Sequence, residues 1–198
     1  MKKLLFSVVF VLSLAVLASC ADGVKPAIEQ DQEIEAKIEK ILRRMTLEEK
    51  VGQMSQITIT VIQNNDKDGN PQWIPSMLDS VITKYKVGSI LNVINAQAQT
   101  RELTANMIKV LQEKSMKEIG IPCLYGLDQI HGASYIADAT LFPQEINVAA
   151  TFDRKHAFNM GHVTAYESRA ALNPWSFSPT LDLGRDQRWP RLWESYGE

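Results

Sequence analysis

The chain has 198 residues, of which 45% are hydrophobic and 22% charged, a composition typical of a globular protein that excludes a wholly disordered chain. Its 21 lysines and arginines against 23 aspartates and glutamates give a formal net charge of −2. Proteins that bind nucleic acid through its phosphates concentrate lysine and arginine, so this balance argues against nucleic acid as a partner.

Residues 1–19 have the pattern of an export signal. Two lysines follow the first methionine, and the stretch 4–17 is apolar apart from two serines. This stretch is shorter than the roughly 20 apolar residues that a membrane-spanning helix needs. The following Leu-Ala-Ser-Cys resembles the lipobox of bacterial lipoproteins, which implies that Cys20 carries lipid; the alternative is an ordinary secretory signal cut near Ala21. We expect an exported lipoprotein, facing the periplasm or the cell surface and held to the membrane only through its lipid anchor.

A polar segment separates this signal from the predicted folded part. Residues 20–32 contain a glycine and a proline and lack an apolar period, so they are predicted to form a tether. The folded part is predicted over 33–198. It opens with an amphipathic helix, whose apolar residues recur at helical spacing at Ile34, Ile38, Ile41, Leu42 and Met45.

A second helix is predicted directly afterwards, because Thr46 and Glu49 have the spacing of a capping box. The polar stretch 63–75 is then predicted to be a loop without regular structure. Its Asp-Lys-Asp-Gly run resembles a calcium-binding loop but lacks the glutamate that such a loop needs at its twelfth position, so no metal is expected there.

The remaining sequence alternates between helical and strand patterns. Parallel strands buried on both faces are nearly continuous apolar runs, as at 121–127, where Cys123 is expected as a small buried hydrophobe. This alternation favours an α/β fold, either a barrel or an open doubly wound sheet. No strand is followed by a glycine-rich phosphate loop, which argues against a dinucleotide. The predicted elements are a helix over 77–82, a strand within 87–94, a helix from 103 ended by Gly120, the strand 121–127, a helix over 153–170 and a strand over 177–183.

Two aspartates are predicted to end strands. Asp128 follows the run 124–127, and Asp182 lies in the run 177–183. Ligand groups gather at the carboxyl ends of parallel strands, and a carboxylate there can accept two hydrogen bonds from sugar hydroxyls. The alternatives are a helix cap or a salt bridge for Asp128, and neutralisation of Asp182 by Arg185 and Arg188.

The segment 184–198 places arginines and tryptophans together in one loop. Arginines bind carboxylates or paired hydroxyls, and an indole face stacks on a pyranose ring, so this composition suits a carbohydrate. The alternative is a charge network that braces the loop, formed by Arg185, Asp186, Arg188 and Glu194.

The three histidines do not favour a metal site. His156 and His162 lie six residues apart, which places them on different faces of a helix rather than at the i, i+4 spacing of a zinc helix. His131 is better explained as a hydrogen-bonding group of the loop near the sugar-binding candidates.

Four stretches carry a family resemblance, in this order: 45–54, 126–132, 142–144, and 188–191 together with 194–198. They are similar to the N-terminal domain of glycoside hydrolase family 3, and the resemblance covers most of the chain from residue 34 to residue 198. The resemblance implies an α/β fold, an incomplete (β/α)8 TIM-type barrel of which the chain holds the first few β/α units. It also implies an exo-acting β-glycosidase that retains the anomeric configuration.

When the motifs of this chain are matched to those of the family position by position, the resemblance assigns Asp128 and Arg191 to the pocket of the terminal non-reducing sugar. His131 and Arg188 are weaker candidates. Pro190 stands where the family has a glycine, and this proline removes a backbone donor just before Arg191. The family's other pocket residues, its nucleophilic aspartate and its acid/base glutamate match no position in these 198 residues. We therefore expect no catalytic residue, metal or cofactor in this chain.

The function expected of the complete protein is hydrolysis of terminal β-D-glucosyl residues from β-glucosides or β-linked oligosaccharides by a retaining double displacement. The 198-residue chain alone is expected to be inactive, as a truncated part of that enzyme. Two alternatives stay open: a β-xylosidase of the same family, and a non-catalytic glycan-binding lipoprotein. The sequence makes no prediction about the oligomeric state.

Overall fold

The structure is a computed structural model that describes residues 29–198. The predicted signal 1–19, Cys20 and most of the tether lie outside the described residues. No helix among the residues described is long and apolar enough to cross a membrane. The chain divides into two units between Arg44 and Met45.

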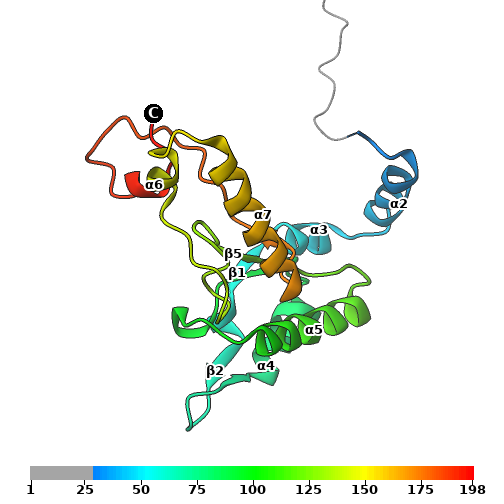
Figure 1. The fold of residues 1–198 in the computed structure, drawn as a ribbon. Coiled ribbons are helices and arrows are strands. Elements are labelled where there is room, and N and C mark those ends of the chain that lie inside the picture. Colours follow the sequence, from blue (N-terminus) through cyan, green and yellow to red (C-terminus); the bar gives the residue numbers. More distant parts are fainter. Residues whose placement is uncertain (1–28) are drawn as a thin grey trace, which may run out of the picture. The chain divides into compact units, whose positions relative to one another are not determined.

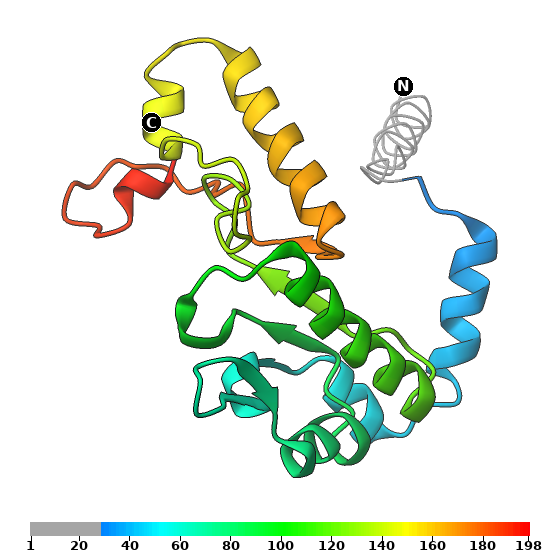
Figure 2. The ribbon, with the colours of Figure 1, turned by 60° about the horizontal axis from the view of Figure 1, so that its bottom comes forward.

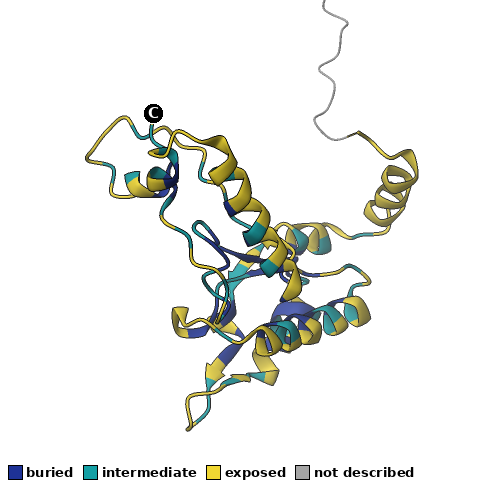
Figure 3. Cartoon of the chain, in the orientation of Figure 1, coloured by how far each residue is buried: buried dark blue, intermediate teal, exposed yellow. Residues whose placement is uncertain are grey.

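The first unit contributes the helix α2 (Gln32–Leu42), which confirms the first predicted helix (Figure 1). Asp31 caps it, because its carboxylate accepts hydrogen bonds from the backbone N–H groups of Glu33 and Ile34. The apolar stripe is present, but no residue of α2 is buried (Figure 3).

The second unit is built on a parallel sheet, as the α/β prediction requires. Its four strands lie in the order β1, β4, β5, β6, so the sheet is open in the described part of the chain. Gln56 lies opposite Ser89, Ser89 opposite Leu124, and Gly126 opposite Trp175. The strands are β1 (Gln56–Thr58), β4 (Ser89–Leu91), β5 (Leu124–Leu127) and β6 (Trp175–Ser176).

Helices connect successive strands. The capping box predicted at Thr46 is present, with both of its reciprocal hydrogen bonds to Glu49. The helix before β5 ends with Gly120 at a φ of 73°, a left-handed conformation that glycine adopts without strain. The helices are α3 (Leu47–Gln53), α4 (Pro75–Leu78) continuing into the π-helical turn η2 (Asp79–Lys84), α5 (Arg101–Glu118), α6 (Glu145–Ala149) and α7 (Arg154–Ala170), with 3-10 turns η1 (Ile59–Val61), η3 (Ile94–Ala96) and η4 (Leu192–Glu194).

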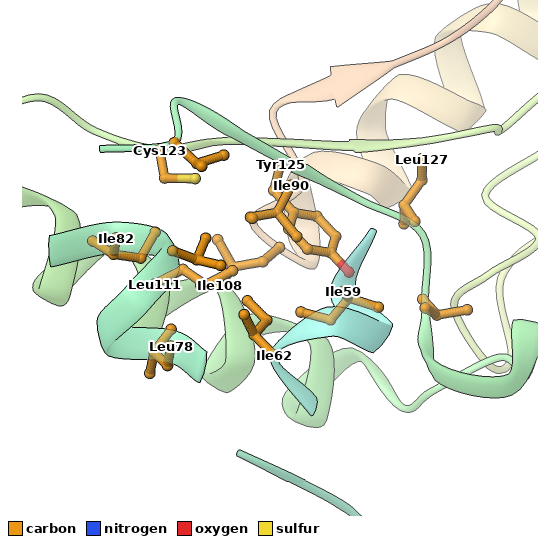
Figure 4. Close-up of a cluster of buried hydrophobic side chains, with 13 residues drawn as sticks. Ile59, Ile62, Leu78, Ile82, Ile90, Ile108, Leu111, Cys123, Tyr125 and Leu127 are labelled. Carbon is orange, nitrogen blue, oxygen red and sulfur yellow. The ribbon is translucent and has the colours of Figure 1, made fainter. Parts of the chain in front are cut away.

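The main core lies between the strands and α5, which runs beside them (Figure 2). Ile90 and Tyr125 of the sheet and Leu111 of α5 belong to one buried cluster (Figure 4). The Tyr125 hydroxyl is paired, since it donates to the backbone carbonyl of Asn92. Cys123 is buried in the same cluster as predicted, and burial raises the pKa of its thiol to about 11.

The stretch 63–75 is not the unstructured loop that its polar composition predicted. It forms an antiparallel hairpin of β2 (Gln63–Asn65) and β3 (Pro71–Trp73). The Asp66 carboxylate accepts hydrogen bonds from the backbone N–H groups of Asp68 and Asn70, at 2.9 and 2.8 Å, and so closes the turn. The polar residues that suggested a loop therefore make the turn of a hairpin.

The last predicted strand is also misplaced. The sheet ends with β6 at 175–176, whereas the predicted strand covered 177–183. The Phe177 N–H still bonds to the Leu127 carbonyl at 2.9 Å, but Pro179 has no N–H with which to continue the ladder. Asp182 consequently lies in an irregular segment beyond the strand rather than at its end.

Gly126 of β5 makes room for the aromatic ring that follows β6. A Cβ built on Gly126 of β5 would lie 2.2 Å from the Phe177 ring, which occupies that space just after β6. The Phe177 ring also packs edge-on against Trp175, with ring centroids 4.8 Å apart. Gly126 thus allows the segment after β6 to lie directly against β5, immediately before Asp128.

Candidate functional site

The candidate site lies at the carboxyl ends of β5 and β6. Asp128 directly follows β5, as predicted, and is half-buried. The segment after β6 is hydrogen-bonded to the segment after β5, because the Ser178 hydroxyl donates to the Gln129 carbonyl at 3.0 Å. This bond fixes the start of the segment that continues to Arg191.

Arg191 is held by a residue of its own turn. Its Nε donates to Oε2 of Glu194 at 2.7 Å, and its Nη2 donates to the same oxygen. Glu194 is only 7% exposed, whereas 57% of the Arg191 side chain remains exposed. A buried carboxylate therefore fixes one edge of the guanidinium, and its other N–H groups have no hydrogen-bond partner among residues 29–198 and can donate to a ligand.

Three carboxylates act on this guanidinium. The hydrogen bond to Glu194 and the charge of Glu194 raise the pKa of Arg191 most, and the charges of Asp128 and Asp182 raise it further. Burial raises the pKa of Tyr135, and the charge of Asp128 adds to this shift. The charges of Asp128 and Asp182 therefore both act on the Arg191 guanidinium.

Neither alternative for Asp128 is found in the structure. Within residues 29–198 its carboxylate caps no helix and forms no ion pair. The same part of the chain shows no ion pair between Asp182 and either Arg185 or Arg188. Asp128 thus presents a carboxylate whose acceptor positions are available to a ligand.

His131 belongs to a closed loop next to Asp128. Its Nδ1 lies 3.2 Å from the Phe142 carbonyl oxygen, and the Phe142 N–H donates to the His131 carbonyl at 2.8 Å. A carbonyl only accepts, so Nδ1 carries a proton in this arrangement. Gly132 has a φ of 110°, and a Cβ there would lie 2.2 Å from the Thr140 carbonyl oxygen. The loop therefore requires glycine after His131.

Arg188 is paired within its own loop. It is exposed, and both its Nε and its Nη2 donate to the Asp186 carboxylate, with the shortest contact at 2.6 Å. The charge network considered from the sequence is instead two separate pairs, Arg188 with Asp186 and Arg191 with Glu194. The charge of Asp128 contributes to the raised pKa of Arg191, whereas the raised pKa of Arg188 comes from its hydrogen bond to Asp186.

Glu145 is a buried acid that the sequence does not predict. Glu145 begins α6, where a glutamate is an ordinary first-turn residue, yet it is only 1% exposed. Burial raises the pKa of Glu145 to about 7, the charge of Glu194 adds to the rise, and the nearby N–H of Thr180 opposes it. Its burial arises from the packing of α6 against η4, far along the chain, so no local sequence signal could have revealed it.

The other two histidines lie apart from this site. His156 and His162 are exposed on α7, and the His162 ring stacks on Phe158 with centroids 6.1 Å apart. Among the residues that the structure describes, no group of three or more histidine, cysteine or acidic side chains is arranged to hold a metal ion.

Comparison with known families matches residues 46–198 to the family model described as "Glycosyl hydrolase family 3 N terminal domain". The chain is 32% identical over 171 residues to a lysosomal beta glucosidase of Dictyostelium discoideum, covering 81% of this chain and 20% of that protein. It is 27% identical over 166 residues to a periplasmic beta-glucosidase of Salmonella typhimurium, covering 83% and 19%. A putative beta-xylosidase of Formosa agariphila is 29% identical over 168 residues, covering 83% and 21%.

Solved structures of a glucanase and a glucosidase are also similar to this chain. An exo-1,3/1,4-beta-glucanase from a Pseudoalteromonas species is similar with a TM-score of 0.71 and 32% identity, over 87% of this chain and 21% of that one. A beta-glucosidase from Listeria innocua in complex with glucose is similar with a TM-score of 0.60 and 30% identity, over 85% and 22%. The chain thus spans about a fifth of the length of these relatives.

Proposed function

The chain belongs to glycosyl hydrolase family 3, and from this membership we propose that it forms the sugar-holding part of a β-glucosidase. By complete protein we mean this chain together with any coding sequence that adjoins it. In this proposal the complete protein releases terminal β-D-glucosyl residues with retention of configuration. The carboxylates that break the bond lie in the part of the protein outside these 198 residues.

One observation supports the sugar-holding role above all: the Asp128 carboxylate, directly after β5 and unpaired among residues 29–198, acts by its charge on the Arg191 guanidinium that Glu194 holds in place. A carboxylate accepts hydrogen bonds from two neighbouring hydroxyls, and a guanidinium donates to others. Together they can fix the orientation of a pyranose ring before any bond is broken.

Holding a sugar does not by itself hydrolyse it. A retaining glycosidase needs two carboxyl groups about 5–5.5 Å apart, one to attack the anomeric carbon and one to protonate the leaving oxygen. Asp128 is assigned to the sugar hydroxyls, and Glu194 is occupied by Arg191. We therefore propose that the chain positions the substrate and takes no part in the double displacement itself.

The nature of the sugar is the finer part of the proposal. Glucosidases from Dictyostelium and Salmonella support glucose, and the xylosidases of Formosa support xylose as the second candidate. Comparing aryl β-D-glucoside with aryl β-D-xyloside as substrates of the complete protein decides between them.

A glycan-binding lipoprotein is the non-enzymatic alternative. The coding sequence that adjoins Glu198 separates the two: in the enzyme it encodes the family's remaining pocket residues and its nucleophilic aspartate, and in the binder it does not. The periplasmic relative supports export, and we propose that Cys20 carries the lipid anchor. Incorporation of a labelled fatty acid into the parent protein and not into Cys20→Ala tests that anchor.

The experiment that tests the proposed function compares hydrolysis of an aryl β-D-glucoside by the complete protein, by its Asp128→Ala variant and by the 198-residue chain. We expect activity in the first, a strong loss in the second and none in the third.

A further inference from the structure

Glu145 and Glu194 are two buried acids that approach each other from distant parts of the sequence. Glu145 lies in the first turn of α6, and α6 packs against η4, which carries Glu194. Their exposed fractions are 1% and 7%. The charge of Glu194 therefore acts on Glu145 with little screening by water.

A cavity of 250 Å³ lies beside Glu145. Three atoms of its lining residues are buried and have no hydrogen-bond partner among residues 29–198: Oε2 of Glu145, Nε2 of Gln129 and Oγ1 of Thr164. The wall also contains Ser176, Ser178 and Tyr196 beside apolar residues such as Ile130 and Pro179. The Glu145 carboxyl thus lies beside a largely apolar cavity whose lining residues include no lysine, arginine or histidine.

No positive charge from the elements packed around Glu145 faces this carboxyl in the described part of the chain. The α7 residues of the wall are Ala157, Met160, Gly161, Thr164 and Ala165, none of which titrates. The segment after β6 contributes the N–H of Thr180, and the chain end contributes Tyr196, whose pKa is raised by burial and by the charge of Glu145. η4 contributes Glu194, an anion whose one guanidinium partner is Arg191.

We propose that Glu145 is a positioning residue for Arg191: its neutral form leaves Glu194 free to hold the guanidinium, and its ionised form disturbs that pair and weakens sugar binding. This inference rests on the sugar-holding role proposed above for Arg191. It adds a pH-dependent control to that site, and it requires only that Glu145 lose its proton to solvent.

The physical basis is the cost of two adjacent buried anions. When Glu145 ionises, Glu194 is the nearest like charge, and repulsion is relieved by moving Glu194 or by sharing Arg191 between the two acids. Either response moves the guanidinium from the place where Glu194 now fixes it. Because the pKa of Glu145 is raised to about 7, this change falls at neutral pH.

The test measures D-glucose affinity of the complete protein by calorimetry between pH 5.5 and pH 8.5. If only the neutral form of Glu145 binds well, the apparent Kd rises about tenfold from pH 6 to pH 8. Glu145→Gln keeps the shape of a neutral acid, so its Kd is expected to be independent of pH over this range. Glu113→Gln, a matched change at an exposed glutamate of α5, is expected to follow the parent.

Glu145→Ala separates positioning from packing. A merely structural role predicts that both Glu145 variants weaken binding equally at every pH. The positioning role predicts that neither variant shows the parent's rise in Kd with pH, because neither carries a charge at position 145, and that Glu145→Gln binds at every pH as the parent does at pH 6. A parent and a Glu145→Gln variant with the same pH dependence would overturn the inference.

A second readout keeps this inference separate from the proposed function. If the parent binds no glucose at any pH and Asp128→Ala changes nothing, the sugar-holding proposal fails. NMR of labelled glutamate and arginine side chains still decides the inference, because the Arg191 Nε resonance must shift as Glu145 titrates, and must not shift in Glu145→Gln. An Arg191 resonance that stays fixed through the titration of Glu145 contradicts it.

Discussion

Arg191 donates through both Nε and Nη2 to a single oxygen of Glu194, three residues further along the same turn. The pair joins a buried acid to a guanidinium that is more than half exposed. The protein interior thus determines where the guanidinium lies, and its exposed side remains available to a sugar hydroxyl.

Loss of the Glu194 charge is expected to weaken sugar binding. Glu194→Gln in the complete protein removes the charge that fixes Arg191, and a partly exposed ion pair of this kind contributes about 1 kcal/mol, or roughly fivefold in affinity. Calorimetry with D-glucose measures the change. Asp186→Asn, which breaks the neighbouring Arg188 pair, is the control and should bind as the parent does. Equal affinity in Glu194→Gln and the parent would show that Arg191 needs no such support.

Gly126→Ala is expected to destabilise the complete protein. The new methyl group would lie 2.2 Å from the Phe177 ring, and overpacking of this kind costs about 1–3 kcal/mol. The urea midpoint measures the loss. The matched change Gly161→Ala on α7 meets no atom within 4 Å and should stabilise the helix by about 0.5–1 kcal/mol. A Gly126→Ala variant as stable as the parent would show that the Phe177 ring does not fill this space.

Glu145→Gln is expected to stabilise the protein at alkaline pH. Because the pKa of Glu145 is raised from an ordinary value of 4.5 to about 7, the folded state binds more protons than the unfolded state between these values. The parent therefore loses stability as pH rises from 4.5 through 7, at about 1.4 kcal/mol for each unit of upward shift. Thermal melts at pH 5 and pH 8 measure the effect. The variant should exceed the parent at pH 8 much more than at pH 5, and a constant difference would contradict this assignment.

The isolated 198-residue chain is expected to associate. Four parallel strands leave two open sheet edges in the described part of the chain, and large apolar side chains such as Phe152, 96% exposed, lie uncovered. Light scattering after size exclusion should therefore show concentration-dependent oligomers. A monomer with a cooperative thermal melt would show instead that the chain folds as an independent unit.

The parts of the fold that sequence reasoning predicted are those encoded by local chemistry. Thr46 and Glu49 make their own capping box, Gly120 ends its helix, and the apolar run before Asp128 is a buried strand. The short strand β1 and helix α6 were missed, because three to five residues are too few to show a period. The hairpin was missed because its turn-forming residues suggested a loop. The last strand was misplaced, and Pro179 cannot continue its ladder of hydrogen bonds.

The candidate site, too, could be predicted only where local sequence encodes it. Asp128 could be placed at a strand end, because it directly follows an apolar run. The proximity of Asp182 to Arg191, and the burial of Glu145 against Glu194, depend on how the segment after β6 folds back, which no local pattern encodes. Arg191 was proposed from its motif and stays a prediction. Glu194 was predicted to belong to a larger charge network, but among the described residues its ion pair is with Arg191.

The central claim is that this chain holds the sugar and does not break the bond, and hydrolysis of an aryl β-D-glucoside tests it most directly. The complete protein should lose about a hundredfold or more in kcat/KM on Asp128→Ala, since hydrogen bonds to a charged group contribute about 1.5–3 kcal/mol each. Asp128→Asn should be intermediate, and the purified 198-residue chain should give no hydrolysis above the blank. Hydrolysis by that chain alone, abolished by Asp128→Ala, would contradict the account.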